Sequence, residues 1–316
     1  MRITRRAFGA GVAGAAVLWR AAAFAETAPT EVRIGFQKTN LPVVAQRERT
    51  IERALGPDVA VKWVEFSAGP PLVEALNVGA IDLGWTGDAP PIFGQSAGAA
   101  ITYVAALPPN GKGEAIIAKP GSGIASVADL AGGTVGVGKG TSAHNLLVAA
   151  VEGAGIPYDQ LKVNYLAPAD GAAAFAAGQI DAWSVWDPFL AIAETRYRPT
   201  VLVRGSDILK VNTYFLGNKG FVAAHPETVL KVLDGLRQAA AWADAHRPEV
   251  AQALHDVTGV PLDAQQLAAD RAEFGIFEIT SDIIAHQQET ADRFFRLGLI
   301  PKQITVADAV WAPPRS

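Results

Sequence analysis

The sequence predicts an α/β protein with two similar lobes, each a sheet covered by helices. Strand patterns and helix patterns alternate along residues 31–203, which is typical of sheets with helices on both faces. In addition, one strand-and-helix phrase recurs at an offset of 99 residues, which indicates a repeated unit. The chain has 316 residues, of which 50% are hydrophobic, so two such units can each bury a core.

The expected elements follow from local patterns taken in chain order. Strands are predicted where short apolar or alternating runs stand between turn residues, and helices where helical periodicity is bounded by Gly or Pro signals. The expected strands are 31–36, 60–66, 81–86, 100–106, 114–119, 134–137, 161–165, 182–185 and 200–203. The expected helices between them are 43–55, 72–78, 89–97, 145–152 and 187–194, and further helices follow at 226–246, 248–258, 263–274 and 281–297.

The repeated phrase occupies residues 75–90 and 174–188, and it indicates a short helix, a strand and an aspartate-initiated helix. Two aspartates coincide in the two copies, and the second of each pair, Asp88 or Asp187, stands just before a proline-containing helix start. An N-cap is the simplest role for such an aspartate. The alternative is contact with a ligand, because open α/β sheets bind ligands at their strand ends.

The glycine-rich segment GGTVGVGKGTSAHN, residues 132–145, raises the question of a nucleotide or another anion. Both nucleotide motifs are incomplete, since Gly140 stands where a P-loop has its Mg²⁺-binding hydroxyl and the glycine spacing does not fit a dinucleotide loop. A helix start still offers unpaired N–H groups to a small anion, here from Thr141, Ser142 and Ala143. The simpler alternative, which the segment favours when taken alone, is that a hydroxyl caps its own helix.

Residue types exclude or disfavour several kinds of chemistry. The chain has no cysteine, so it forms no disulfide and offers no thiolate to a metal or a substrate. Its five histidines lack the spacing of a zinc site, and no G-x-S-x-G nucleophile elbow is present. We therefore expect no metal, no other cofactor and no catalytic residue.

Residues 1–25 predict an export signal, with Arg5 and Arg6 before an uncharged run and a small-x-small site at 23–25. The adjacent arginines are typical of a twin-arginine signal, so we expect cleavage before Glu26 and a periplasmic protein. Removing the signal leaves 23 basic and 31 acidic residues, a formal charge of −8. This balance disfavours a nucleic-acid partner. No later segment has the length and apolarity of a membrane span.

Several phrases together resemble one family. These are GFQK (35–38), TGDAPPIF (86–93), GKGTSAHN (138–145), AWSVWDPF (182–189) and the segment around 212–215. They resemble the aliphatic sulfonate-binding proteins, which belong to the sulfonate/taurine/nitrate group of periplasmic ABC-transporter receptors. The combination of GDAPP with KGTSAHN is specific, whereas either alone is weak.

The resemblance implies a type II periplasmic-binding-protein fold, in which two α/β lobes are joined by two hinge crossings and close on a ligand. Lobe 1 would comprise 26–108 and 214–316, and lobe 2 would comprise 109–213. The hinge segments would be at about 108–113 and 204–213.

The resemblance also implies a binding site in the cleft between the lobes. Gly87, Asp88 and Ala89 would form one wall, and the start of the helix after the glycine-rich segment would form the other. The complete expected set is Gln37, Lys38, Gly87, Asp88, Ala89, Thr141, Ser142, Ala143, Trp186, Asp187 and Asn212. The organic tail of the ligand would lie against Trp186, Pro91 or Phe93.

The implied function is the binding of an aliphatic sulfonate and its delivery to an ABC permease for sulfur acquisition. The protein would be a monomeric receptor without enzymatic activity, without stable membrane insertion and without a nucleic-acid partner. Two alternatives stay open. One is a receptor of the same fold for taurine, nitrate or bicarbonate, and the other is an exported cofactor-dependent oxidoreductase.

Overall fold

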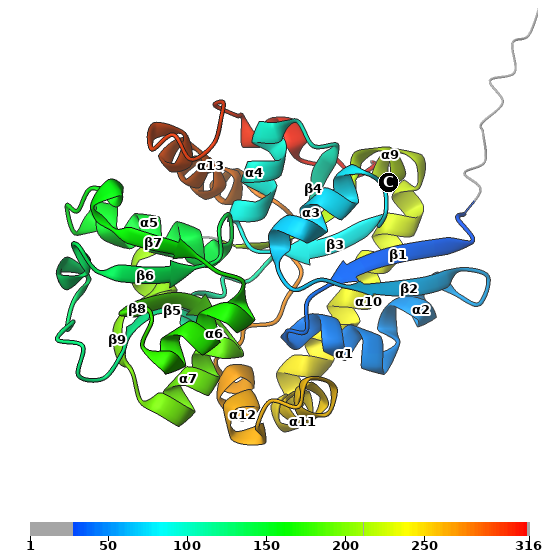
Figure 1. Ribbon diagram of the computed structural model, residues 1–316. Coiled ribbons are helices and arrows are strands. Elements are labelled where there is room, and N and C mark those ends of the chain that lie inside the picture. The colour runs from blue at the N-terminus through cyan, green and yellow to red at the C-terminus, as the bar shows by residue number, and fades with distance from the viewer. Residues whose placement is uncertain (1–27, 211, 315–316) are drawn as a thin grey trace, which may run out of the picture.

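The structure is a computed structural model that describes residues 28–210 and 212–314, so the predicted signal at 1–25 lies outside the described residues. It contains two five-stranded mixed sheets, and Figure 1 shows them on opposite sides of the molecule with helices packed around each. The strands are β1 (Glu31–Phe36), β2 (Ala60–Glu65), β3 (Leu83–Thr86), β4 (Ile101–Leu107), β5 (Glu114–Ala118), β6 (Thr134–Val137), β7 (Lys162–Tyr165), β8 (Ala182–Trp186), β9 (Thr200–Arg204) and β10 (Thr213–Asn218).

The helices cover both sheets and continue into a helical C-terminal part. They are α1 (Asn40–Glu48), α2 (Thr50–Leu55), α3 (Gly69–Asn77), α4 (Ala89–Ala97), α5 (Ser142–Gly153), α6 (Pro168–Ala177), α7 (Phe189–Tyr197), α8 (Gly205–Ile208), α9 (Lys219–Ala224), α10 (Pro226–Ala245), α11 (Arg247–Thr258), α12 (Leu262–Arg271) and α13 (Ser281–Arg296). Within the described ranges, none of the helices is both long and apolar enough to cross a membrane.

The two sheets have equivalent strand orders, β2-β1-β3-β10-β4 in the first lobe and β7-β6-β8-β5-β9 in the second. In each sheet four strands run in one direction, and the fourth position in the strand order is taken by an antiparallel strand that arrives from the other lobe. The connections β4–β5 and β9–β10 are therefore the two crossings. This is the two-lobed type II fold, and the repeated phrase corresponds to α3–β3–α4 in one lobe and α6–β8–α7 in the other.

Most expected elements are confirmed, and β1, β6 and α4 have the predicted bounds. The single helix expected at 43–55 is wrong: it is two helices, because Arg49 adopts a left-handed conformation with φ 51° and ends α1. Helix α5 begins three residues earlier than expected, at Ser142. The strand β10 was not predicted, because its buried run TYFLGN does not alternate between apolar and polar residues.

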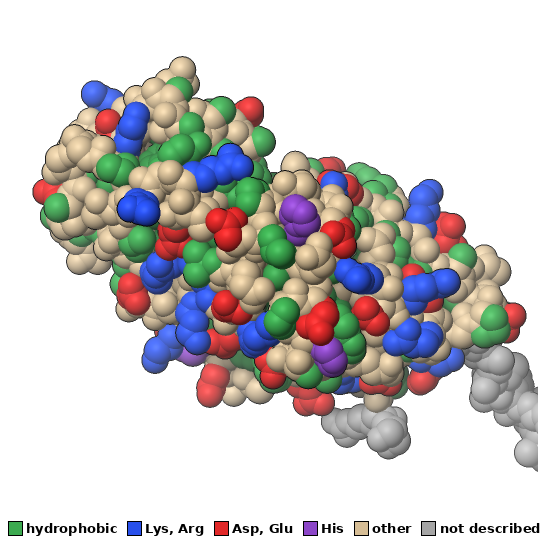
Figure 2. Space-filling view, turned by 90° about the horizontal axis from the view of Figure 1, so that it is seen from below, with side chains coloured by type: hydrophobic (Ala, Val, Ile, Leu, Met, Phe, Trp, Pro, Cys, Tyr) green, Lys and Arg blue, Asp and Glu red, His purple; other side chains and the backbone are tan. Residues whose placement is uncertain are grey.

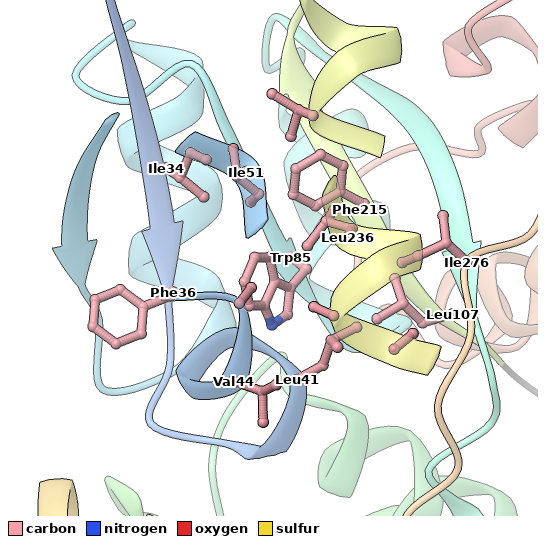
Figure 3. Packing of buried hydrophobic residues seen from close by; sticks show 14 of the residues in the cluster. Ile34, Phe36, Leu41, Val44, Ile51, Trp85, Leu107, Phe215, Leu236 and Ile276 are labelled. Carbon is pink, nitrogen blue, oxygen red and sulfur yellow. The ribbon is translucent and has the colours of Figure 1, made fainter. Parts of the chain in front are cut away.

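The core of the first lobe reaches the cleft through Trp85 on β3. Figure 3 shows this indole surrounded by Leu41, Phe215 and Leu236, and its ring centroid is 5.8 Å from that of Phe215. Burying an aromatic ring of this size stabilises a fold by roughly 1.5–3 kcal/mol. Because Trp85 also lines the cavity described below, the strand end at the cleft is fixed by the core.

Candidate functional site in the interlobe cleft

A cavity of about 140 Å³ lies where strand ends of both sheets meet the crossings. Gln37 and Gly87 line it from the first lobe, Thr141 and Ser142 from the second, and Asn212 from a crossing. A cavity of about 150 Å³ holds benzene in an engineered protein, so this one has room for a small organic anion.

The start of α5 opens into this cavity without a side-chain cap. The Thr141 hydroxyl donates to the carbonyl of Gly138 at 2.7 Å, and the Ser142 hydroxyl donates to Glu114 Oε1 at 2.6 Å. Among the described residues, the N–H groups of Ser142 and Ala143 have no hydrogen-bond acceptor. The self-capped helix that the sequence left open is therefore contradicted, and two amide hydrogens remain for a ligand.

A buried histidine holds the loop before α5. The Gly140 N–H donates to His144 Nδ1 at 3.2 Å, and His144 Nε2 lies 2.8 Å from the Tyr158 hydroxyl. Burial, and then the charge of Lys139, lower the pKa of His144 to about 4, so the ring is neutral at neutral pH. Its Nδ1 is then the acceptor and its Nε2 the donor, which fixes the loop at Gly140, where φ is 70°.

The opposite wall contacts α5 closely. A Cβ on Gly87 would lie 2.8 Å from Ser142 Cβ, so glycine allows the two lobes to approach here. Asp88 is only 1% exposed, and Asn145 on α5 donates to its Oδ2. Burial raises the pKa of Asp88 to about 6. Ala89 is buried in the core and does not line the cavity.

The remaining predicted residues divide between the cavity and other sites. Trp186 lines the cavity wall, whereas the Lys38 ammonium lies 3.1 Å from Glu65 Oε1 and outside the lining. Asn212 donates to the Leu107 carbonyl at 2.7 Å and so joins the two crossings. The side chain of Ala143 is buried in the core of the second lobe.

Asp187 lines the cavity, but its carboxylate is already bound. Arg271 on α12 donates to it through Nε at 2.6 Å and Nη2 at 2.5 Å, and the Ala191 N–H donates to its Oδ1 at 3.0 Å. The last bond lies in the first turn of α7, but the N-cap of this helix is Pro188, whereas the simple capping interpretation predicts Asp187. Asp187 therefore anchors α12 to the second lobe, and Figure 1 shows α12 beside α7.

The apolar residues that line the cavity differ in part from those expected. Pro91 and Phe93 do not line the cavity, and Phe93 instead packs edge-on against Phe294 with ring centroids 5.2 Å apart. Trp85 and Phe274 join Trp186 in the lining. The sequence contained no signal for Phe274, because the segment that follows α12 brings it to the cleft from far along the chain.

Sequence reasoning also missed Glu114, the first residue of β5. Its side chain lines the cavity and the residue is 4% exposed. Burial, and then the charge of Asp88, raise the pKa of Glu114 to about 8. A lone acid that begins the apolar run EAIIA directly after the first crossing is a signal that could have identified it.

The ionisable side chains that line the cavity, among the described residues, are all acidic or neutral. The described residues that line it include the acids Asp88, Glu114, Asp187 and Glu273 but no Lys, Arg or His. No group of three or more described His, Cys, Asp or Glu residues is arranged to hold a metal ion. On the outer face in Figure 2, basic and acidic side chains are interspersed rather than gathered in one basic field.

A ligand-sized cleft between two lobes that carry equivalent mixed sheets defines a substrate-binding protein of the type II periplasmic fold. The family model described as NMT1/THI5 like matches residues 58–251. The chain belongs to this family and, within it, to the aliphatic sulfonate-binding proteins.

Similar proteins support this membership. The alkanesulfonate-binding protein SsuA from Xanthomonas axonopodis pv. citri, solved bound to MOPS, is 37% identical with a TM-score of 0.87 and covers 90% of this chain and 99% of that one. The periplasmic aliphatic sulphonate binding protein SsuA from Escherichia coli is 36% identical with a TM-score of 0.84, and the match covers 92% and 94%. A curated relative from Escherichia coli (strain K12), named for binding aliphatic sulfonates, is 37% identical over 290 residues, 92% of this chain and 91% of the relative.

Proposed function

We propose that this chain is the periplasmic receptor of an ABC importer, that it binds an aliphatic sulfonate in the interlobe cleft, and that it delivers the sulfonate to a permease. The relatives are binding proteins rather than enzymes. The observation that carries the proposal is the uncapped start of α5, where the Ser142 and Ala143 amides have no acceptor among the described residues.

The chemistry of a sulfonate suits this helix start. A sulfonate spreads one negative charge over three oxygens, and each hydrogen bond to a charged group contributes about 1.5–3 kcal/mol. Two amides and the helix dipole can hold such an anion without a cation. The carbon tail lies against Trp85, Trp186 and Phe274.

The acidic lining favours a monoanion over a dianion. Sulfate and phosphate would carry more negative charge toward Asp88, which lines a cavity without a described cation, and like charges repel at short range. Ligand contacts to both lobes favour the closed form, because only such differential contacts shift a hinge equilibrium.

Three finer statements complete the proposal. The lobe boundaries at 108–113 and 204–213 act as the hinge, since both β4–β5 and β9–β10 pass there. The mature chain begins at Glu26 after twin-arginine export, and it acts as a monomer.

Calorimetric titration of residues 26–316 tests the function. We expect ethanesulfonate to bind more tightly than sulfate, nitrate or bicarbonate, and titration with taurine shows whether an amine on the tail is preferred. Tighter binding of nitrate or bicarbonate would support the other receptor class, and absorbance from a copurified flavin or nicotinamide would support the oxidoreductase.

A pair of variants tests the site. Ser142→Asp places a carboxylate at the first position of α5 and is expected to reduce ethanesulfonate affinity at least a hundredfold. Ser281→Asp makes the same change at the first position of α13, away from the cleft, and is expected to bind like the wild type. Equal affinity for both variants would contradict the site.

A further inference from the structure

We propose that Glu114 binds the ligand as a neutral carboxylic acid, which donates a hydrogen bond to a sulfonate oxygen beside the start of α5. This inference rests on the proposed function, because it concerns the same cleft. It makes Glu114 a specificity-determining residue for fully ionised oxyanions, which can only accept hydrogen bonds.

The position of the carboxyl group is the first argument. Glu114 Oε1 accepts the hydroxyl of Ser142 at 2.6 Å, and Ser142 is the first residue of α5. The carboxyl group therefore lies one hydroxyl away from the amides that hold the sulfonate. An ionised carboxylate at this point would repel the anion, whereas a carboxylic acid would add a donor.

The second oxygen of the carboxyl group is the next argument. Glu114 Oε2 has no hydrogen-bond partner among the described residues, although the residue is 4% exposed and lines the cavity. A Cβ on Gly205 would lie 3.6 Å from this oxygen, at an ordinary van der Waals distance, so this neighbour does not crowd it. A proton on Oε2 can thus be donated to a ligand in the cavity.

The charges that face Glu114 are the third argument. Asp88, at the start of α4, lies across the cleft and disfavours a second negative charge. Asp187, at the end of the paired strand β8, is neutralised by Arg271, and Lys112 is neutralised by Glu273 at 2.8 Å.

The other elements around β5 supply no counter-charge either. Arg204 on the paired strand β9 is bound to Glu194 at 2.6 Å, and His144 on α5 is neutral at neutral pH. With no described cation in the lining, the raised pKa of about 8 follows from burial and Asp88, and Glu114 holds its proton at pH 7.

The proposal predicts the pH dependence of binding. Ethanesulfonate keeps one charge throughout the range, so its affinity is constant below the pKa of Glu114 and falls above it. For a pKa of about 8, the affinity at pH 9 is about tenfold lower than at pH 7. Near pH 9, binding also takes up close to one proton, since the carboxyl must be protonated again.

The experiment is calorimetric titration with ethanesulfonate at pH 7 to 9.5 in Tris and in borate, neither of which is a sulfonate. Tris and borate release different heats when they give up a proton. Comparing the binding heats in the two buffers therefore gives the number of protons taken up on binding, and this measurement needs only the wild-type protein. Glu114→Gln keeps a donor that does not titrate, so its affinity is expected to be equal at pH 7 and pH 9. Glu249→Gln removes an exposed acid in the first turn of α11, away from the cavity lining, and is expected to keep the wild-type pH dependence.

A wild-type affinity that is constant to pH 9.5 without proton uptake would overturn the proposal. A Glu114→Gln variant that loses taurine but not ethanesulfonate would also overturn it, because the carboxylate would then pair with the ligand's ammonium group. If the wild type binds no sulfonate at any pH, the proposed function fails and this inference fails with it. Pronounced pH dependence with proton uptake, absent in Glu114→Gln, supports it.

Discussion

Replacing Arg271 by alanine would leave a buried carboxylate without its cation. The Arg271 side chain is 12% exposed and donates two hydrogen bonds to Asp187 and one, at 2.7 Å, to Glu194. Removing one partner of a buried pair costs about 3–5 kcal/mol. Glu194 keeps Arg204 as a second partner, so we expect the lower end, about 3 kcal/mol. At about 2–4 °C per kcal/mol, the melting temperature falls by roughly 6–12 °C.

The assay is urea unfolding and differential scanning calorimetry of the ligand-free mature chain. Arg237→Ala is the matched control, because Arg237 pairs with Asp234 on the surface and its side chain is 46% exposed. An exposed pair of this kind contributes about 0.2–1 kcal/mol. If Arg271→Ala loses no more free energy of unfolding than Arg237→Ala, the buried pair does not hold α12 to the second lobe as argued.

Two further predictions concern the walls of the cleft. Gly140 has φ 70° and faces the Phe93 ring, so Gly140→Val is expected to lower sulfonate affinity at least tenfold, as measured by titration. The control is Gly132→Val: Gly132 has a similar φ of 76° but open space around it, and this variant is expected to keep the affinity. The folded pKa of Asp88, about 6, lies above its unfolded value, so this group lowers stability as pH rises from 4 to 6, by up to about 3 kcal/mol. Asp88→Asn removes this contribution, so we expect the variant to become more stable relative to the wild type as the pH rises from 4 to 7. Urea unfolding of both proteins at pH 4 and pH 7 measures this difference in the free energy of unfolding.

The sequence was sufficient for the elements whose signals are local. The helix at 89–97 follows an aspartate, has two prolines in its first turn and ends before a glycine with φ 85°, and the strand at 134–137 stands between glycines. The strand β10 could not be predicted in this way. It lies between β3 and β4, and its burial depends on partners that the chain supplies more than a hundred residues earlier.

The residues of the site could likewise be predicted only where their signals are local in the sequence. The helix start at Ser142 is a local property, so its anion-binding potential could be predicted, whereas the absence of a cap depended on the direction of two hydroxyls. Thr141 turns to Gly138 and Ser142 to Glu114, which lies 28 residues away in the sequence. No spacing rule predicts that second contact, and so Glu114 was missed.

Asp88 and Asp187 show why equal motifs acquire different roles. Each follows the central strand of its sheet and precedes a helix, as the repeat predicted. Asn145, 57 residues away, donates to Asp88 without neutralising it, whereas Arg271, 84 residues away, gives Asp187 a full counter-charge. The charge of Asp88, which has no direct ion pair among the described residues, lies on the cleft side and raises the pKa of Glu114. The repeat therefore placed both carboxylates correctly, and the distant partner determined which of them sets the electrostatics of the ligand site.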